Sequence, residues 1–249
     1  MEKIITDREG YDWIVREGRV YNNSNQDALA ANINHEIKIL NIIRSFCGAK
    51  YFIDIGAHTG YYSVRLIETM PNIIAIEMIP ANYEALFKNI YLNKHRNESC
   101  VISLINVGLW KERITGTAFD RGMESCLKEA FETKAEPGQY FNKHEIQLVP
   151  LNEVLNNVPI KDAIVKIDTD GADLQIMQGA SNLLNIENSV WVIEHHARMF
   201  QGNRKQDIID LLMNYGFDKS YDVNEYEIIV SKGFFTSQLE KIITKKEGT

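Results

Sequence analysis

The sequence has few cysteines, no signal-like leader and no long apolar run, and each shortage excludes a class of protein. Its three cysteines, Cys47, Cys100 and Cys126, lie far apart and form no CxxC pair, which argues against a zinc knuckle or a disulfide framework. This usage is typical of a reducing compartment, so we expect a cytoplasmic protein. No stretch approaches the roughly 20 apolar residues of a membrane span, and no membrane association is expected.

The chain also has no excess of basic residues. It carries 27 basic and 34 acidic residues, a net charge of −7, whereas a nucleic-acid-binding protein usually shows a basic patch or stripe. We therefore expect no nucleic-acid partner. With 249 residues, 45% of them hydrophobic, the chain is long enough for one large domain with a substantial core.

Short apolar runs alternate with amphipathic segments along most of the sequence. Strands are predicted at 51–55, 72–77, 100–109, 146–151, 162–168 and 189–196, helices at 33–46, 60–70, 81–94, 172–184 and 204–217, and an antiparallel hairpin at 219–232. This alternation is typical of a parallel sheet that helices cover on both faces.

Three further segments flank or interrupt this domain, which spans 51–235. Residues 1–50 form an N-terminal extension, polar over its first 30 residues and expected to be irregular or partly helical. A polar insert at about 110–145 could form a hairpin with a flexible loop. Residues 119–142 are either a lid over the substrate or a surface loop without a role. Residues 236–249 are expected to form a C-terminal tail.

Polar residues gather where the predicted strands end. In open α/β sheets, ligands bind at the carboxyl ends of the strands. The residues found there are Asp54, Gly56, His58 and Gly60 after the first strand, Glu77 after the second, Asn106 at the third, Asp168 and Asp170 after the fourth, and Glu194, His195 and His196 at the fifth. We expect Asp54, Gly56, His58, Gly60, Glu77, Asn106 and Asp168 to bind a cofactor.

The glycine turn between Gly56 and Gly60 is by itself as consistent with a structural corner as with a cofactor site. Glu77 favours the cofactor, because it lies 23 residues after Asp54, where doubly wound folds bind ribose hydroxyls. The turn lacks the G-x-G-x-x-G spacing that cradles a pyrophosphate. It therefore fits an adenosyl group better than NAD.

Four segments, "FIDIGAHTGYYSV", "IAIEMIPANYEALFKNIYLN", "IVKIDTDGADLQIMQGA" and "WVIEHH", together resemble the FkbM family of S-adenosylmethionine-dependent methyltransferases. The resemblance covers about residues 51–196. It implies the class I methyltransferase (Rossmann-like) fold, a seven-stranded, mostly parallel sheet with a C-terminal antiparallel hairpin. It also implies S-adenosylmethionine as the cofactor and O-methylation of a hydroxyl on a small-molecule or glycan acceptor, such as a sugar or a natural product.

The resemblance assigns roles to individual residues. Asp54, Gly56 and Gly60 match the cofactor loop of the family, Glu77 its ribose-binding acid, Asp168, Gly171 and Asp173 its fourth-strand motif, and Glu194 the acid ending its fifth strand. The chain departs from the family at His58, Met78, Asn152, Asp170 and Asp173, where the family usually has Asn, Pro, Asp, Glu and Glu. These departures concern substrate or metal geometry more than the cofactor.

Methylation of a hydroxyl requires a general base in reach of its proton or a metal that acidifies it. His195 is our predicted base, because it follows the fifth strand and imidazole titrates near neutrality, although a structural histidine is the alternative. His196 is expected to point the other way. Asp168 and Glu194 complete the predicted catalytic set. Asp168 would orient the hydroxyl.

Asp168 and Asp170 are spaced to share one face, where they could hold a divalent metal, orient the hydroxyl or cap the next helix. Lys166 lies on the same face and could instead neutralise one acid. Metal is not favoured. Two other functional classes remain open: a nicotinamide-dependent oxidoreductase and a non-catalytic subunit with a methyltransferase fold.

Overall fold

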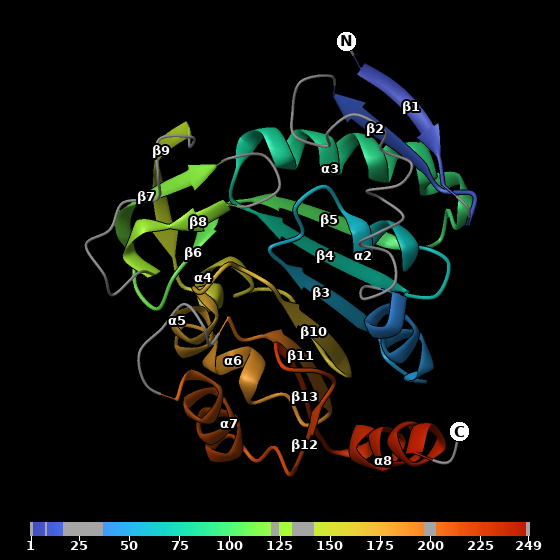
Figure 1. Ribbon diagram of the computed structural model, residues 1–249, viewed down its shortest axis with the longest axis vertical. Coiled ribbons are helices and arrows are strands. Elements are labelled where there is room, and N and C mark those ends of the chain that lie inside the picture. Colours follow the sequence, from blue (N-terminus) through green and yellow to red (C-terminus); the bar gives the residue numbers. More distant parts are fainter. Residues whose placement is uncertain are drawn as a thin grey trace.

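The computed structural model describes residues 2–7, 9–16, 37–120, 125–130, 142–196 and 203–247. Its main feature is a seven-stranded sheet in the order β12-β13-β11-β10-β3-β4-β5 (Figure 1). The strands are β3 (Tyr51–Ile55), β4 (Asn72–Glu77), β5 (Val101–Asn106), β10 (Ala163–Ile167), β11 (Ser189–Glu194), β12 (Lys219–Asp222) and β13 (Glu227–Lys232). Neighbours are parallel, except that β13 is antiparallel to β11 and β12. The predicted sheet and its antiparallel hairpin are confirmed.

Helices cover both faces of this sheet, which explains why its central strands are almost wholly apolar. One face packs against α4 (Leu151–Val154), α5 (Asp173–Gln178), α6 (Ser181–Leu184) and α7 (Arg204–Asn214). The other packs against the helix over residues 37–45, α2 (Tyr61–Arg65), α3 (Pro80–Asn93) and α8 (Phe234–Glu247). Side chains alternate between these faces along each strand. Ile53 and Ile55 therefore face the first helix layer, and Phe52 and Asp54 face the second.

A second sheet, in the order β6-β9-β7-β8, occupies the predicted insert. Its strands are β6 (Gly108–Leu109), β7 (Ile114–Asp120), β8 (Ser125–Leu127) and β9 (Asn142–Val149), and the short 3-10 helix η2 (Lys128–Ala130) follows β8. β7 and β9 form the expected hairpin, with Asp120 opposite Asn142. The predicted strand over 100–109 is two strands in different sheets. Residues 121–124 and 131–141 of the predicted lid lie outside the described residues.

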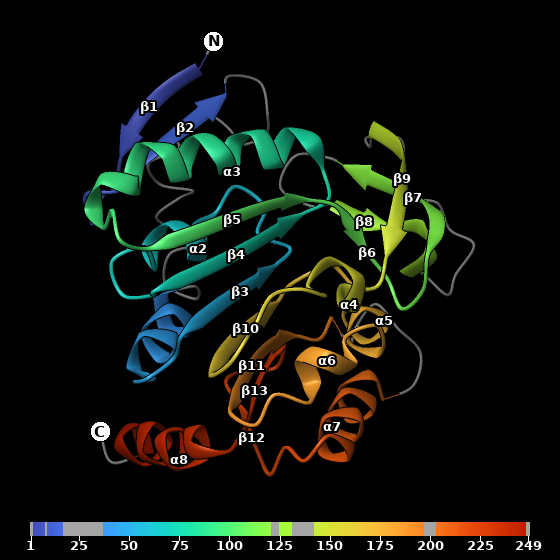
Figure 2. The same ribbon diagram turned by 180° about the vertical axis from the view of Figure 1, so that it is seen from behind.

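An N-terminal hairpin lies over α3 (Figures 1 and 2). It consists of β1 (Glu2–Thr6) and β2 (Asp12–Arg16). Two α3 side chains bind β2: Asn93 Oδ1 accepts the Asp12 N–H at 3.0 Å and Asn89 Oδ1 accepts the Ile14 N–H at 2.7 Å. The irregular or partly helical lead-in expected from the polar sequence is therefore wrong for the described part of this segment, because contacts to a distant helix stabilise the strand.

Two helices differ from their predicted bounds for visible reasons. The predicted helix over 172–184 breaks at Gly179, where a Cβ would lie 2.6 Å from the Trp110 carbonyl oxygen. The expected tail is mostly helix α8, which buries Phe235 and Leu239 and packs Phe235 edge-on against Phe46. A short 3-10 helix, η1 (Lys94–Arg96), continues α3. Among the described residues, no helix combines the length and apolar character that crossing a membrane requires.

Candidate active site

A cavity of about 340 Å³ lies at the carboxyl ends of β3, β4 and β10. Of the residues singled out at the strand ends, those that line it are Asp54, Gly56, His58, Glu77, Asp168, Asp170, Glu194 and His196. Gly60, Asn106 and His195 are not among its lining residues. The parallel strands therefore bring acids far apart in the sequence to one rim, as predicted.

The glycine turn is shaped by the neighbouring strand end. Gly56 has φ 82°, and a Cβ on it would lie 1.8 Å from the Asp168 carbonyl oxygen, so no larger residue fits. Gly60 has φ 95°, and its Cβ would lie 2.7 Å from Leu86 of α3. The two glycines thus allow the turn to pass close to β10 and α3. They serve the site through packing.

Glu77 holds the turn from the end of β4. Its side chain is 3% exposed. One carboxylate oxygen accepts the His58 N–H at 2.9 Å, and the other accepts the Ile79 N–H at 2.8 Å. Burial raises the pKa of Glu77, while the nearby His58 and these N–H donors oppose the rise. Glu77 therefore lines the cavity and fixes the turn at once.

Two other predicted cofactor residues have contrasting positions. Asp54 lines the cavity and accepts a 2.6 Å hydrogen bond from the Ser63 hydroxyl, and burial raises the pKa of Asp54 to about 6 despite the charge of Lys166. Asn106 instead donates its amide to the Glu77 carbonyl oxygen at 2.7 Å. Asn106 thus supports the chain that carries Glu77 rather than facing the cavity.

Asp168, Glu194 and His196 form a charged cluster at the cavity wall. His196 Nε2 lies 3.5 Å from Glu194 Oε1 and 3.3 Å from Asp170 Oδ1. Lys166 Nζ donates to Asp168 Oδ2 at 2.8 Å, the pairing that the sequence raised as an alternative to metal binding. The cluster therefore combines two carboxylates, an imidazole and a neighbouring ammonium group.

These contacts move the pKa values of Asp168, Glu194 and His196 in different directions from their usual values. Burial, together with the charge of Asp168, raises the pKa of Glu194 to about 8. Burial would lower the pKa of His196, but the hydrogen bond to Asp170 and the charge of Asp168 outweigh it and raise that pKa to about 9. Burial would likewise raise the pKa of Asp168, but Lys166 and His196 together lower it. Asp168 is thus held ionised, while Glu194 titrates near neutral pH.

The two histidines lie the other way round from our prediction. His195 is 2% exposed, its N–H donates to the Tyr226 carbonyl oxygen, and its ring nitrogens have no hydrogen-bond partner among the described residues. Burial lowers the pKa of His195. Glu194, the last residue of β11, faces the cavity, so alternation turns the next residue, His195, to the opposite face. His196 follows with φ 41° and lines the cavity again. The geometry gives His195 no access to an acceptor in the cavity.

The candidate metal ligands also differ from the predicted pair. One ligand atom each of Asp168, Glu194 and His196 lies within 4.8 Å of the others, a spacing that suits a metal ion. Asp170 is not one of these three residues, but its carboxylate contacts His196. The Lys166 ammonium group beside Asp168 already supplies a positive charge, which disfavours a second cation there.

A family model for the FkbM methyltransferase domain matches residues 54–219, more than half of the chain. The chain belongs to this family. The FkbM resemblance seen in the sequence is thereby confirmed, and the match contains every cavity residue from Asp54 to His196. Among curated proteins, none matches this FkbM chain.

Solved structures place the FkbM domain in the class I methyltransferase fold. The structure of methyltransferase FkbM from Methylobacillus flagellatus is 13% identical, with a TM-score of 0.53 over 74% of this chain. This chain spans 43% of that structure's length. TYW2 from M. jannaschii, solved in complex with AdoMet, is 12% identical, with a TM-score of 0.50 over 92% of this chain and 84% of that one. At such identities the likeness shows the fold.

The fourth-strand motif of the FkbM domain includes a residue whose role is structural. Asp173 is fully buried, and its carboxylate accepts a 2.8 Å hydrogen bond from Arg204 of α7. The same Arg204 nitrogen donates to the Gly171 carbonyl oxygen at 2.6 Å. Asp173 and Arg204 thus anchor the turn that follows Asp168.

Sequence reasoning missed several cavity residues of this FkbM chain. Trp13 and Ile14 come from the N-terminal hairpin, Asn89 from the middle of α3 and Leu127 from β8. None follows a predicted strand of the central sheet, whereas the predicted site residues all lie at or just after the ends of such strands. Leu127 brings the insert to the cavity, while its predicted movement as a lid stays a prediction.

Proposed function

We propose that this FkbM protein transfers a methyl group from S-adenosylmethionine to a hydroxyl of a small-molecule or glycan acceptor, such as a sugar or a natural product. Family and fold support methyl transfer. The proposal that the acceptor is a hydroxyl rests on the position of Glu194. This carboxyl group, with a pKa of about 8, lies on the wall of the cavity that Glu77 also lines. A cytoplasmic location belongs to the proposal and agrees with three free cysteines.

The residues present fit the cofactor. The cavity volume of about 340 Å³ lies within the range of small-molecule sites, roughly 300–1,000 Å³. A carboxylate has about four lone-pair positions, so Glu77 retains acceptor capacity for a ribose hydroxyl beside the two N–H groups and the Asn82 side chain that it binds. When bound, S-adenosylmethionine supplies a methyl group made electrophilic by its sulfonium.

The charge of the cavity favours this cofactor over a dinucleotide. Five carboxyl-bearing residues line it: Asp54, Glu77, Asp168, Asp170 and Glu194. The cations Lys166 and His196 also line it, and Glu194 with its pKa of about 8 is largely uncharged at neutral pH, but the remaining four carboxyl groups still outnumber the two cations. A positively charged sulfonium is attracted to such a lining, whereas the pyrophosphate of NAD would be repelled. This argues against the nicotinamide-dependent alternative.

The charged cluster suits removal of a hydroxyl proton. Ionised Glu194 can accept the proton, since its pKa about 8 is far closer to neutrality than that of an ordinary carboxyl group. Asp168, which Lys166 keeps ionised, would orient the hydroxyl by accepting a hydrogen bond. The cationic His196 would stabilise the negative charges of Asp168 and Glu194. Such general-base catalysis typically contributes ~10²–10⁴-fold.

Calorimetry with the purified protein tests the cofactor. S-adenosylmethionine should bind the wild type, and NAD should not. Glu77→Ala should weaken S-adenosylmethionine binding by roughly ten- to a hundredfold, because hydrogen bonds to charged groups are worth about 1.5–3 kcal/mol. NAD binding in place of S-adenosylmethionine would favour the oxidoreductase, and unchanged affinity in Glu77→Ala would contradict the assignment of Glu77.

Transfer of labelled methyl groups to a panel of hydroxyl and amine acceptors tests the reaction. Adjacent histidines provide a matched pair of variants. His196→Gln should lower turnover substantially while leaving S-adenosylmethionine affinity within about threefold. His195→Gln should lower turnover little. The reverse order would restore His195 as the base. Transfer to amines alone would refute O-methylation, and binding without transfer to any acceptor would favour a non-catalytic subunit.

A further inference from the structure

The N-terminal hairpin forms part of the cavity wall. Trp13 and Ile14 of β2 line the cavity together with residues of the glycine turn. Both lie outside residues 54–219, the part of the chain that the family model matches. The family match therefore assigns no role to this wall.

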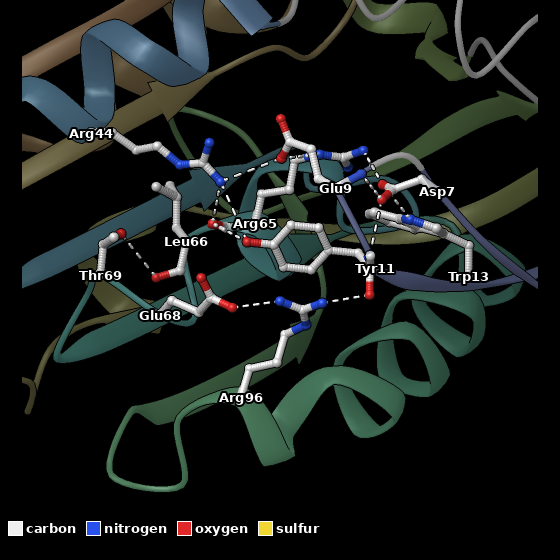
Figure 3. A network of polar contacts seen from close by, with 11 residues as sticks. Asp7, Glu9, Tyr11, Trp13, Arg44, Arg65, Leu66, Glu68, Thr69 and Arg96 are labelled. Carbon is white, nitrogen blue, oxygen red and sulfur yellow. Dashed lines mark hydrogen bonds and ion pairs between the residues drawn. The ribbon is translucent and has the colours of Figure 1, made fainter.

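A buried arginine helps to hold the hairpin in place. Arg65 of α2 is 2% exposed and forms an ion pair with Asp7 of the hairpin (Figure 3). Its guanidinium carbon lies 4.7 Å from the ring centre of Trp13 and 4.2 Å from that of Tyr61. Trp13 and Tyr61 both line the cavity. The hairpin is thus fixed against the same helix that follows the glycine turn.

Asn89 connects the hairpin directly to the glycine turn. Its side chain is 1% exposed, accepts the Ile14 N–H at 2.7 Å and donates to the Thr59 carbonyl oxygen at 2.8 Å. The two backbone partners fix which amide atom is oxygen, because one partner can only donate and the other can only accept. Thr59 follows His58, whose N–H binds Glu77. Hydrogen bonds and the backbone of Thr59 and His58 therefore form a continuous path from Ile14 to Glu77.

We propose that Asn89 is a positioning residue that couples hairpin docking to cofactor binding. This inference rests on the proposed function, since the coupled ligand is S-adenosylmethionine. A ligand that requires the turn in this conformation favours the Asn89 bridge, and the bridge favours the docked hairpin. Such coupling is reciprocal: the docked hairpin increases affinity for the ligand by the same factor.

Asn93 provides a matched control on the same helix, one turn further along. Its side chain accepts the Asp12 N–H and donates at 2.7 Å to the Asp12 carbonyl oxygen, so it also binds the hairpin. The Asn93 side-chain amide also donates a hydrogen bond to the Asn89 carbonyl oxygen, and this bond does not reach the turn. Asn93 therefore shares the hairpin contact of Asn89, its burial and its helix, but it lacks the link to Thr59 and does not line the cavity. Because of this second difference, the hydrogen-exchange measurement at Ile14 is the part of the test that is specific to the coupling.

The test compares Asn89→Asp with Asn93→Asp. Each substitution adds one buried carboxylate and keeps an acceptor for the hairpin N–H, but only Asn89→Asp removes the donor to Thr59. Asn89→Asp should raise the Kd for S-adenosylmethionine about tenfold, and Asn93→Asp less than about threefold. In wild type, S-adenosylmethionine should slow hydrogen exchange at the Ile14 amide. Asn93→Asp should retain this protection and Asn89→Asp should lose it.

Asn89→Ala and Asn93→Ala repeat the comparison without an added charge, in case a buried carboxylate prevents folding. Equal loss of affinity in both members of a pair would overturn the proposal, as would Ile14 exchange that S-adenosylmethionine does not change in wild type. Failure of wild type to bind S-adenosylmethionine would instead overturn the proposed function, and the coupling with it. Calorimetry on the wild type separates these two failures.

Discussion

Glu194 is a carboxyl group whose surroundings oppose its charge. Burial raises its pKa to about 8 together with the charges of Asp168 and Glu227, and the charges of His196 and Lys166 counter them. Its proton affinity is thus set by a balance among groups that reach it from β10, from the end of β11 and from β13. Replacing one of these groups should move the titration in a direction that the charges dictate.

This balance predicts the pH dependence of turnover. In the proposed mechanism the ionised form of Glu194 is the base, so turnover should rise as pH increases through about 8. His196→Gln removes a cation that lowers the pKa of Glu194, so the rise should shift to higher pH. Glu194→Gln should abolish it. Turnover measured from pH 6 to 9.5 at saturating substrates checks these outcomes, and a shift toward lower pH in His196→Gln would contradict them.

The residues at the strand ends show how far sequence could go. Asp54, Glu77, Asp168 and Glu194 could be predicted to share a rim because parallel strands align their carboxyl ends. The choice between His195 and His196 depended on one residue of strand register, which reverses every side chain. Short apolar runs do not define register to that precision.

At the scale of elements, the turn from β3 to α2 fits β10 so closely that only glycine is accommodated at Gly56. Gly56→Ala should cost ~4 kcal/mol or more, because it combines a strained φ with a clash against the Asp168 carbonyl. Gly216→Ala is the matched control, with nearly the same φ, 81°, and, apart from its two chain neighbours, no atom of the described part of the chain within 4 Å of the added Cβ. It should cost about 1–2 kcal/mol. Urea denaturation of both variants measures the difference, and equal losses would refute the steric argument.

The link between α7 and the turn after β10 gives a second prediction at this scale. Asp173→Ala leaves the buried Arg204 without its carboxylate, so the free energy of unfolding should fall by about 3–5 kcal/mol. Lys205, the next residue on α7, pairs with Asp222, which is 59% exposed. Asp222→Ala should cost about 0–1 kcal/mol. Thermal denaturation of both variants checks the contrast. Similar losses of stability would mean that the buried ion pair stabilises the protein no more than the exposed one.

On the scale of the whole molecule, the folded unit extends beyond the part that the family model matches. The helix over residues 37–45 and the following Phe46 bury five large apolar side chains against the sheet: Ile39, Leu40, Ile42, Ile43 and Phe46. Their burial is worth about 7–15 kcal/mol, which is similar to the whole stability of a typical domain.

A chain that begins at residue 51 should therefore not fold cooperatively. A chain that begins at residue 37 keeps these side chains and should fold, although it lacks the hairpin wall and should bind S-adenosylmethionine more weakly. Circular dichroism melting curves and size-exclusion chromatography distinguish the two truncations. A cooperative transition of the shorter chain at the temperature of the full-length protein would show that this helix is dispensable.

Local pattern predicted the central sheet better than the parts that pack around it. The central strands β3, β4, β10 and β11 are almost wholly apolar runs, and their alternation with helices indicates a parallel sheet. Hairpin residues such as Trp13 and Ile14 take their conformation from Arg65 and Asn89, which lie far along the chain. The local sequence around the hairpin does not indicate those contacts, so the hairpin and its part in the cavity could not be predicted.

The two asparagines of α3 have a further consequence for solubility. One side of β2 pairs with β1, and its other side would present unpaired N–H groups to solvent, a ready template for recruiting a strand from another molecule. Asn89 and Asn93, one helical turn apart, match the two-residue repeat of β2 and occupy the N–H groups of Ile14 and Asp12. The helix thus takes the place of a neighbouring strand and protects this edge from aggregation.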